Sequence, residues 1–131
     1  MKILVQTIFS LMCMACLNVN KQLKYVSIEI INDSYFKVDT LSFLLNNYKS
    51  YVINIESSDT LLLKINKDSI KTYSDFHLDV WAYFKTSKPL NLVKYQVYYD
   101  DLWGSLYEKY TITLKKDTSI YILPHFSNKL Y

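Results

Sequence analysis

The chain has 131 residues, of which 50% are hydrophobic and 21% charged, so it fits one folded domain and is too apolar for a disordered chain. Its net charge is only +3, and every basic residue is Lys, because the sequence contains no Arg. Nucleic-acid recognition depends on dense basic charge and on the guanidinium fork, so the composition argues against a nucleic-acid partner.

The segment 1–15 predicts a secretory signal peptide. Lys2 supplies a positive start, and the stretch 3–17 is almost entirely apolar. This stretch is about 15 residues long, whereas a transmembrane helix needs about 20. The small residue Ala15 is of the kind that precedes a signal cleavage site, so we expect export of the chain and cleavage after Ala15.

The residues around the predicted cleavage site, Leu11-Met12-Cys13-Met14-Ala15-Cys16, resemble the bacterial lipobox, although Cys13 stands where Leu is usual. The resemblance implies lipid attachment at Cys16, a tether over 16–23 and a domain over 24–131. The protein would then be a periplasmic or outer-surface lipoprotein of the cell envelope. Ordinary signal cleavage, a retained membrane anchor and a Cys-x-x-Cys redox or metal pair are the alternatives, and the last lacks the further ligands or βαβ context that it needs.

From residue 24 onward, short stretches rich in Tyr, Val, Ile and Thr alternate with polar turns, which favours β-strands over helices. In the first half the β-prone stretches are Lys24–Ile31, Ser34–Val38, Leu41–Leu45, Ser50–Ile55 and Thr60–Ile65, with 69–75 as a connection. The sequence contains one Gly, Gly104, so the tight turns must use Asn, Asp and Ser, whose side chains bond to the nearby backbone.

The clearest predicted strand is Phe76–Phe84, whose residues alternate along its length. We expect one face in the core, with Phe76, Leu78, Val80, Ala82 and Phe84, and the opposite face to carry His77, Asp79, Trp81 and Tyr83. Three further strands are predicted at Leu92–Tyr99, where Val93, Tyr95, Val97 and Tyr99 share one face, at Leu106–Leu114, and at Thr118–Leu123, which Pro124 ends. About seven strands at this spacing predict a single immunoglobulin-like antiparallel β-sandwich, with a small β-barrel as the alternative.

The second half of the chain, Phe76 to Leu123, resembles the end of many small uncharacterised lipoproteins of Bacteroidota-type bacteria. The matching stretches are Asp101-Leu102-Trp103-Gly104, Tyr110-Thr111-Ile112-Thr113-Leu114 and Ile120-Tyr121-Ile122. The resemblance implies a β-sandwich domain and a location in the cell envelope, and it implies no activity.

The sequence shows no pattern typical of a catalytic or metal site, so we expect a protein that is not an enzyme and holds no cofactor or metal. Asp75, His77 and Asp79 alternate on one strand, but a polar outer face explains them better than a metal site, and His125 stands apart from them. A Gly-x-Ser-x-Gly nucleophile elbow and a phosphate loop are both excluded by the single Gly. The neighbouring Asp100 and Asp101 fit a turn.

The remaining candidates for binding are aromatic: Trp81, Tyr83, Tyr98 and Trp103. Such side chains can form a ligand or partner surface, or they can pack against one another across a sheet. Three functions follow: a lipid-anchored, non-enzymatic module that binds a protein or glycan, an immunity-type or inhibitor protein against a secreted toxin or hydrolase, and a carbohydrate binder using Trp81, Trp103 and Asp79.

Overall fold

The computed structural model describes residues 24–71, 76–87, 92–100 and 108–125. Within these ranges the chain forms strands and one short 3-10 helix, η1 (Lys67–Ser69). In chain order the strands are β1 (Tyr25–Asn32), β2 (Val38–Leu45), β3 (Tyr48–Ile55), β4 (Thr60–Asn66), β5 (Phe76–Phe84), β6 (Leu92–Asp100), β7 (Lys109–Leu114) and β8 (Ile120–His125).

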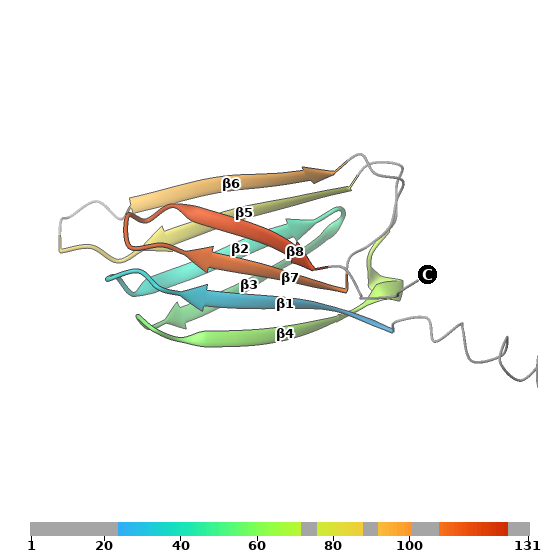
Figure 1. Ribbon diagram of the computed structural model, residues 1–131, viewed down its shortest axis with the longest axis horizontal. Helices are drawn as coiled ribbons and strands as arrows, with labels where there is room; N and C mark the ends of the chain where they lie inside the picture. The colour runs from blue at the N-terminus through green and yellow to red at the C-terminus, as the bar shows by residue number, and fades with distance from the viewer. Residues whose placement is uncertain (1–23, 72–75, 88–91, 101–107, 126–131) are drawn as a thin grey trace, which may run out of the picture.

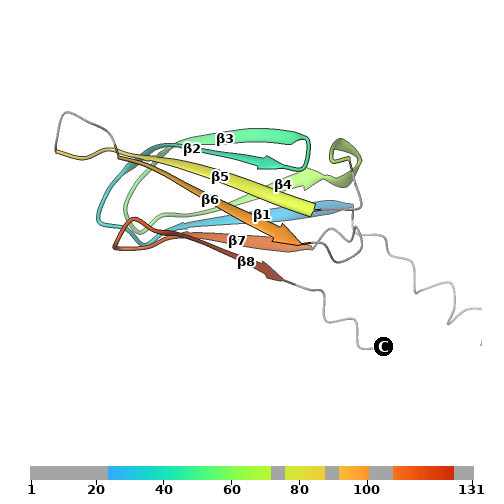
Figure 2. The same ribbon diagram turned by 90° about the horizontal axis from the view of Figure 1, so that it is seen from above.

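The strands form two four-stranded sheets that pack face to face (Figures 1 and 2). The first sheet has the order β4-β1-β7-β8 and the second the order β3-β2-β5-β6. All strand pairs are antiparallel except β1 and β7, which run parallel. The predicted β-sandwich is therefore confirmed, with eight strands where the sequence predicted about seven, and the two separate sheets exclude a closed barrel.

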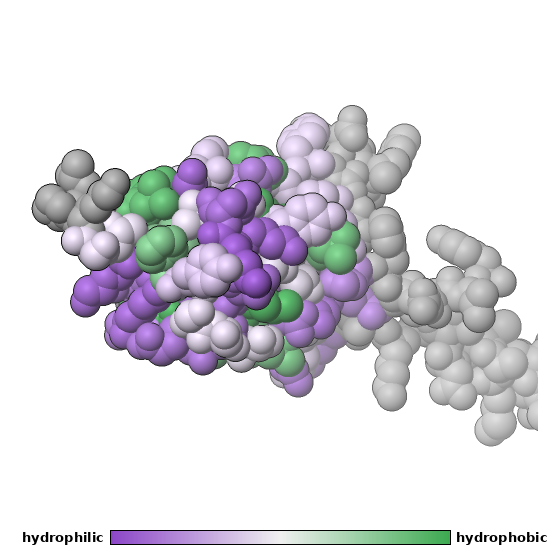
Figure 3. All heavy atoms as spheres, turned by 60° about the vertical axis from the view of Figure 1, so that its left-hand side comes forward, coloured by the Kyte–Doolittle hydropathy of each residue, from purple (hydrophilic) through white to green (hydrophobic). Residues whose placement is uncertain are grey.

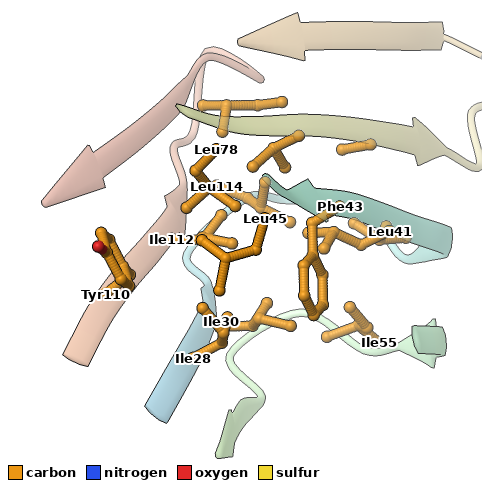
Figure 4. Close-up of a cluster of buried hydrophobic side chains, with 14 of the residues drawn as sticks. Ile28, Ile30, Leu41, Phe43, Leu45, Ile55, Leu78, Tyr110, Ile112 and Leu114 are labelled. Carbon is orange, nitrogen blue, oxygen red and sulfur yellow. The ribbon is translucent and has the colours of Figure 1, made fainter. Parts of the chain in front are cut away.

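The core lies between the sheets and is built from alternate residues of strands in both (Figure 4). The second sheet contributes Leu41, Phe43 and Leu45 from β2, and the first contributes Ile28 and Ile30 from β1, all fully buried. On β5 the buried residues are Leu78, Val80, Ala82 and Phe84, as the alternation predicted. Burial of a core side chain of this size stabilises the fold by roughly 1.5–3 kcal/mol, so the two apolar faces hold the layers together.

Several predicted strand bounds differ from the observed ones, and two of the differences have a clear physical reason. The stretch Ser34–Val38 is not a separate strand, because residues 34–36 form a bend and β2 begins at Val38. The Ser34 hydroxyl accepts from the Phe36 backbone N–H and donates to the Asn32 side chain, which favours a turn over an extended ladder. Pro124 lies inside β8 rather than after it; β8 is an edge strand, where a missing N–H costs no ladder bond.

The turns use Asn, Ser and Thr in place of glycine, which confirms the expectation drawn from the composition for Asn and Ser. Asn46, Ser58 and Thr118 have φ values of 52°, 71° and 66°, in the left-handed region that glycine favours. Asn46 is buried at the β2–β3 turn, where its side chain donates to the Lys71 carbonyl and accepts from the His77 backbone N–H. Side-chain hydrogen bonds of this kind compensate for the backbone strain that a glycine would avoid.

The predicted signal peptide, Cys16 and the tether lie outside the described residues. In the part of the chain that the structure describes, no helix has the length and apolarity needed to cross a lipid bilayer.

Candidate interaction surface

The four aromatic residues singled out in the sequence do not form one cluster. Trp81 and Tyr83 point away from the core on β5, because their neighbours Val80 and Ala82 are buried. Tyr98 lies on the opposite side of the second sheet: its partner on β5 is the buried Leu78, and its ring packs edge-on against core residue Tyr110 at 6.4 Å. Trp103 lies outside the described residues.

Trp81 and Tyr83 instead belong to a larger set of side chains on the outer face of the second sheet. The strand register aligns Tyr51, Ser42, Trp81 and Tyr95 in one row across all four strands. A neighbouring row contains Ile53, Thr40, Tyr83 and Val93, and β6 adds Val97 and Tyr99 beyond these rows. We call the eight large residues of this surface the aromatic face: Tyr51, Ile53, Trp81, Tyr83, Val93, Tyr95, Val97 and Tyr99.

The aromatic face is exposed over most of its extent. Apart from the half-buried Trp81, its members have between 37% and 69% of their surface exposed. With strands about 4.8 Å apart and a rise of about 3.4 Å per residue, the face measures about 14 Å by about 20 Å between Cα positions. Within these dimensions the large side chains of β5 and β6 lie side by side, and Ser42 and Thr40 of β2 separate them from Tyr51 and Ile53 of β3. Exposed apolar side chains gathered on one face in this way often mark a functional surface.

The aromatic face is also partly ordered by its own contacts. The Trp81 and Tyr95 rings stack at 5.1 Å between centroids with 26° between their planes. Burial raises the pKa of the Tyr95 hydroxyl, and the charge of Asp79 and a hydrogen bond to Asp79 raise it further. Tyr95 is thus held by the stack on Trp81 and by the hydrogen bond to Asp79, so it loses little side-chain entropy when a partner binds, which favours a role in recognition.

The end of the sandwich where β1 connects to β2, β3 to β4 and β7 to β8, which we call the loop end, differs from the aromatic face in its surface. Figure 3 turns this end toward the viewer, and hydrophilic residues cross the middle of the view with hydrophobic ones as separate spots between them. A scattered distribution of this kind is normal for a protein surface and calls for no binding partner.

Sequence reasoning missed six members of the aromatic face: Tyr51, Ile53, Val93, Tyr95, Val97 and Tyr99. The alternation in β6 grouped its four residues correctly but did not place them outward, because Lys94 and Gln96 make the opposite face the more polar of the two. The deciding fact is the register with β5, which places Tyr95 opposite Trp81 and Val93 opposite Tyr83.

The outer face of the first sheet carries a polar cluster from β1, β7 and β8. The Thr111 hydroxyl donates to Glu29 Oε2 at 3.0 Å and lies 2.8 Å from His125 Nε2, while Lys109 Nζ lies 2.9 Å from the same Glu29 oxygen. Hydrogen bonds from Lys109 and Thr111 lower the pKa of Glu29. These polar groups are hydrogen-bond and ion-pair partners of one another, so we interpret the cluster as a structural link between β1, β7 and β8.

No metal site is apparent in the described ranges, where no group of three or more His, Cys, Asp or Glu residues is placed to hold an ion. His77 and Asp79 point outward from β5 as predicted, beside Tyr99 and Val97 of β6. Asp75 and Asp101 lie outside the described residues, so these two predicted neighbours are not placed.

Comparison with known proteins identifies no family for this chain. No protein-family model matches the chain, and no curated protein matches it. An NMR structure of a protein from Eubacterium rectale is similar at a TM-score of 0.47 with 13% sequence identity, covering 86% of this chain and all of that one.

Proposed function

We propose that this protein is an exported, lipid-anchored and non-enzymatic module that binds another protein through the aromatic face. The observation that carries the proposal is the gathering of exposed Tyr, Val and Ile side chains from β3, β5 and β6 on the outer face of one sheet. Tyr and Trp are the residues that dominate the binding energy of protein interfaces. The lipobox-like sequence ending in Cys16, and the resemblance to small lipoproteins of Bacteroidota-type bacteria, support a site of action at the cell envelope.

The chemistry of the aromatic face also suggests what its partner offers. Lys49 and Asp79 lie on the outer side of the sheet in one row, with Leu44 between them, and β2 adds one further charged residue, the partly exposed Asp39 at the bulge beside Val38. The partner surface is therefore expected to be broad and weakly charged, with hydrogen-bond acceptors for the tyrosine hydroxyls. Trp81, the tryptophan of this face, is half-buried and stacked on Tyr95, which makes it a poor platform for a sugar ring, so a protein partner is favoured over a glycan.

The proposal is tested with the full chain expressed in a bacterium that exports it. A photo-crosslinking amino acid replaces Tyr51 on the aromatic face in one strain and Tyr121 on the outer face of the other sheet in a second. A protein that crosslinks from Tyr51 and not from Tyr121 is then purified, and its affinity is measured. The double variant Tyr51→Ala, Tyr83→Ala is expected to weaken binding at least tenfold, equivalent to about 1.4 kcal/mol.

The matched control is Leu62→Ala with Tyr121→Ala, which removes exposed apolar side chains of the opposite sheet. Equal weakening by both pairs of substitutions, or crosslinks of equal yield from both positions, would contradict the proposal. A purified partner that is a toxin or hydrolase and loses activity on binding would identify the module as an inhibitor. Binding to a glycan array that Tyr51→Ala abolishes, with no protein crosslink, would replace the protein partner by a sugar.

A further inference from the structure

The two sheets have four edge strands, and among the residues that the structure describes, β6 is the one without a feature that prevents pairing with another strand. Pro124 interrupts β8, and an exposed Lys64 lies on β4. In β3, Asn54 has a φ of 55° that breaks the extended ladder, and Lys49 is exposed. Proline, lysine and irregular backbone at an edge are the means by which proteins prevent strand addition.

β6 has nine residues and presents an uncharged row of side chains, Val93, Tyr95, Val97 and Tyr99, along the margin of its sheet. Figure 1 shows it as the outermost strand, with β5 on its inner side. Its charged member among residues 92–99, Lys94, is on the opposite face and half-buried. A long, apolar and uncharged edge is the type of strand that accepts a further strand.

The backbone of β6 is oriented for such pairing at alternate residues. The His77 backbone C=O accepts from Asn46 on the β2 side of β5, so His77 and the other odd-numbered residues of β5 point their backbone groups toward β2. The backbone groups of the even-numbered residues of β5 point the other way, toward β6, and form hydrogen bonds with the even-numbered residues of β6 that lie opposite them. Odd-numbered residues of β6 point their N–H and C=O to the margin, and Gln96 Nε2 covers one such carbonyl, that of Val97, at 3.2 Å.

We propose that β6 pairs antiparallel with β6 of a second copy, about a two-fold axis that passes beside Gln96. Gln96 is the middle residue of β6, so this axis gives full overlap of the two strands. Tyr95 then lies opposite Val97 of the second copy, and Val93 opposite Tyr99. Pairs of an aromatic with a β-branched residue are among the favourable cross-strand pairs of antiparallel sheets.

The charges of β6 are compatible with this register. Lys94 lies opposite Tyr98 of the second copy, so the two lysines are separated by about four residues, or roughly 13 Å, along the strands. This exceeds the Debye length of about 8 Å at physiological ionic strength, and their repulsion is screened. Pairing joins the two sheets into one of eight strands and makes the two aromatic faces continuous, although the inference does not depend on what those faces bind.

The pairing is tested by disulfide trapping in the full chain, with Cys13 and Cys16 replaced by Ser so that no native cysteine remains. Gln96 occupies a pair without mutual hydrogen bonds, where the two Cα atoms lie about 4.5 Å apart, within the range that a disulfide spans. Gln96→Cys is expected to form a covalent dimer on mild oxidation at least tenfold faster than Lys94→Cys or Lys64→Cys. Equal rates for the three variants would overturn the proposal.

A second measurement detects the dimer directly, without an introduced cysteine. The Val97 N–H points to the margin, so Val97→Pro removes no bond to β5 but blocks the bond to a second copy. Sedimentation equilibrium of the full chain in mild detergent is expected to show dimers that Val97→Pro abolishes, with circular dichroism confirming that the variant folds. A wild-type chain that stays monomeric at millimolar concentration would contradict the proposal, whatever Val97→Pro does.

Discussion

At the scale of single residues, Asn32 is the polar side chain on which the loop end of the sandwich depends. It is fully buried, and its amide nitrogen donates to the carbonyl oxygens of Phe36, Ile55 and Glu56 at 2.9, 3.2 and 3.0 Å. Its amide oxygen accepts from the backbone N–H and the hydroxyl of Ser34. One side chain therefore ties the end of β1 to the bend that follows it and to the end of β3.

Replacing Asn32 by Ala is expected to lower the free energy of unfolding by about 3 kcal/mol, because the Ile55 carbonyl loses its donor in a buried bond and the Phe36 and Glu56 carbonyls lose theirs in partly buried ones. Urea denaturation followed by circular dichroism measures the change. The neighbouring Asp33 is exposed, so Asp33→Ala is the control and should change stability by less than about 0.5 kcal/mol. Similar losses from the two substitutions would show that the network around Asn32 contributes little.

At the scale of elements, how well the sequence predicted a strand depended on how different its two faces were. β5 was predicted with its observed bounds, because apolar residues alternate with His77, Asp79 and other residues that favour solvent. β6 was predicted as a strand, but its more apolar row, Val93, Tyr95, Val97 and Tyr99, faces outward, while Lys94 and Gln96 lie on the other face with Tyr98. Tyr98 was therefore chosen as a candidate for the outer surface, although it packs against Tyr110. The first strand was predicted to end at Ile31, one residue before the observed end at Asn32, and the burial of Asn32 has no signal in a single sequence.

The cluster of Glu29, Lys109, Thr111 and His125 was beyond sequence reasoning for a similar reason. Glu29 and Thr111 are 82 positions apart and come together only because β1 pairs in parallel with β7. A parallel pairing between two distant strands leaves no local pattern, since each strand alternates in the same way whichever neighbour it has.

The same cluster makes the stability of the first sheet depend on acid. Hydrogen bonds from Lys109 and Thr111 hold the pKa of Glu29 below its ordinary value of 4.5, which the unfolded chain keeps. The folded state therefore favours the carboxylate, and the resulting stabilisation is complete above pH 4.5 and is lost as the pH falls through the folded pKa. We expect Glu29→Gln to reduce the fall in melting temperature between pH 5 and pH 3.

The control for this titration is Glu108→Gln, which removes a carboxylate from the residue beside β7 without touching the cluster. Thermal unfolding curves at half-unit steps of pH compare the three proteins. An unchanged pH dependence in Glu29→Gln would mean that the link between β1 and β7 adds no net stability.

At the scale of the whole molecule, the proposed anchor places the domain close to a membrane. Cys16 and the first residue of β1, Tyr25, are separated by eight residues. A fully extended chain of that length spans at most about 29 Å. The end of the sandwich where β1 begins would then face the lipid, and the loop end with its polar residues would be the far one.

The anchor predicts that radiolabelled palmitate enters the wild-type chain and not Cys16→Ala, and that Cys16→Ala is found in the soluble fraction of the cell envelope. The control is Cys13→Ala, which keeps the lipidated position and should remain in the membrane fraction. Incorporation of label into Cys16→Ala would exclude this residue as the attachment site and would leave the interaction through the aromatic face as a separate question.

The parallel pairing of β1 with β7 also sets when the domain can complete its fold. Ser27 pairs with Lys109, so the inner neighbour of the first strand is synthesised near the end of the chain. A chain that crosses a membrane from its N-terminus therefore emerges with β1 lacking that partner until most of the domain has followed. Contacts of such long sequence separation form slowly, and the late arrival of β7 would keep the chain unfolded for as long as translocation requires it.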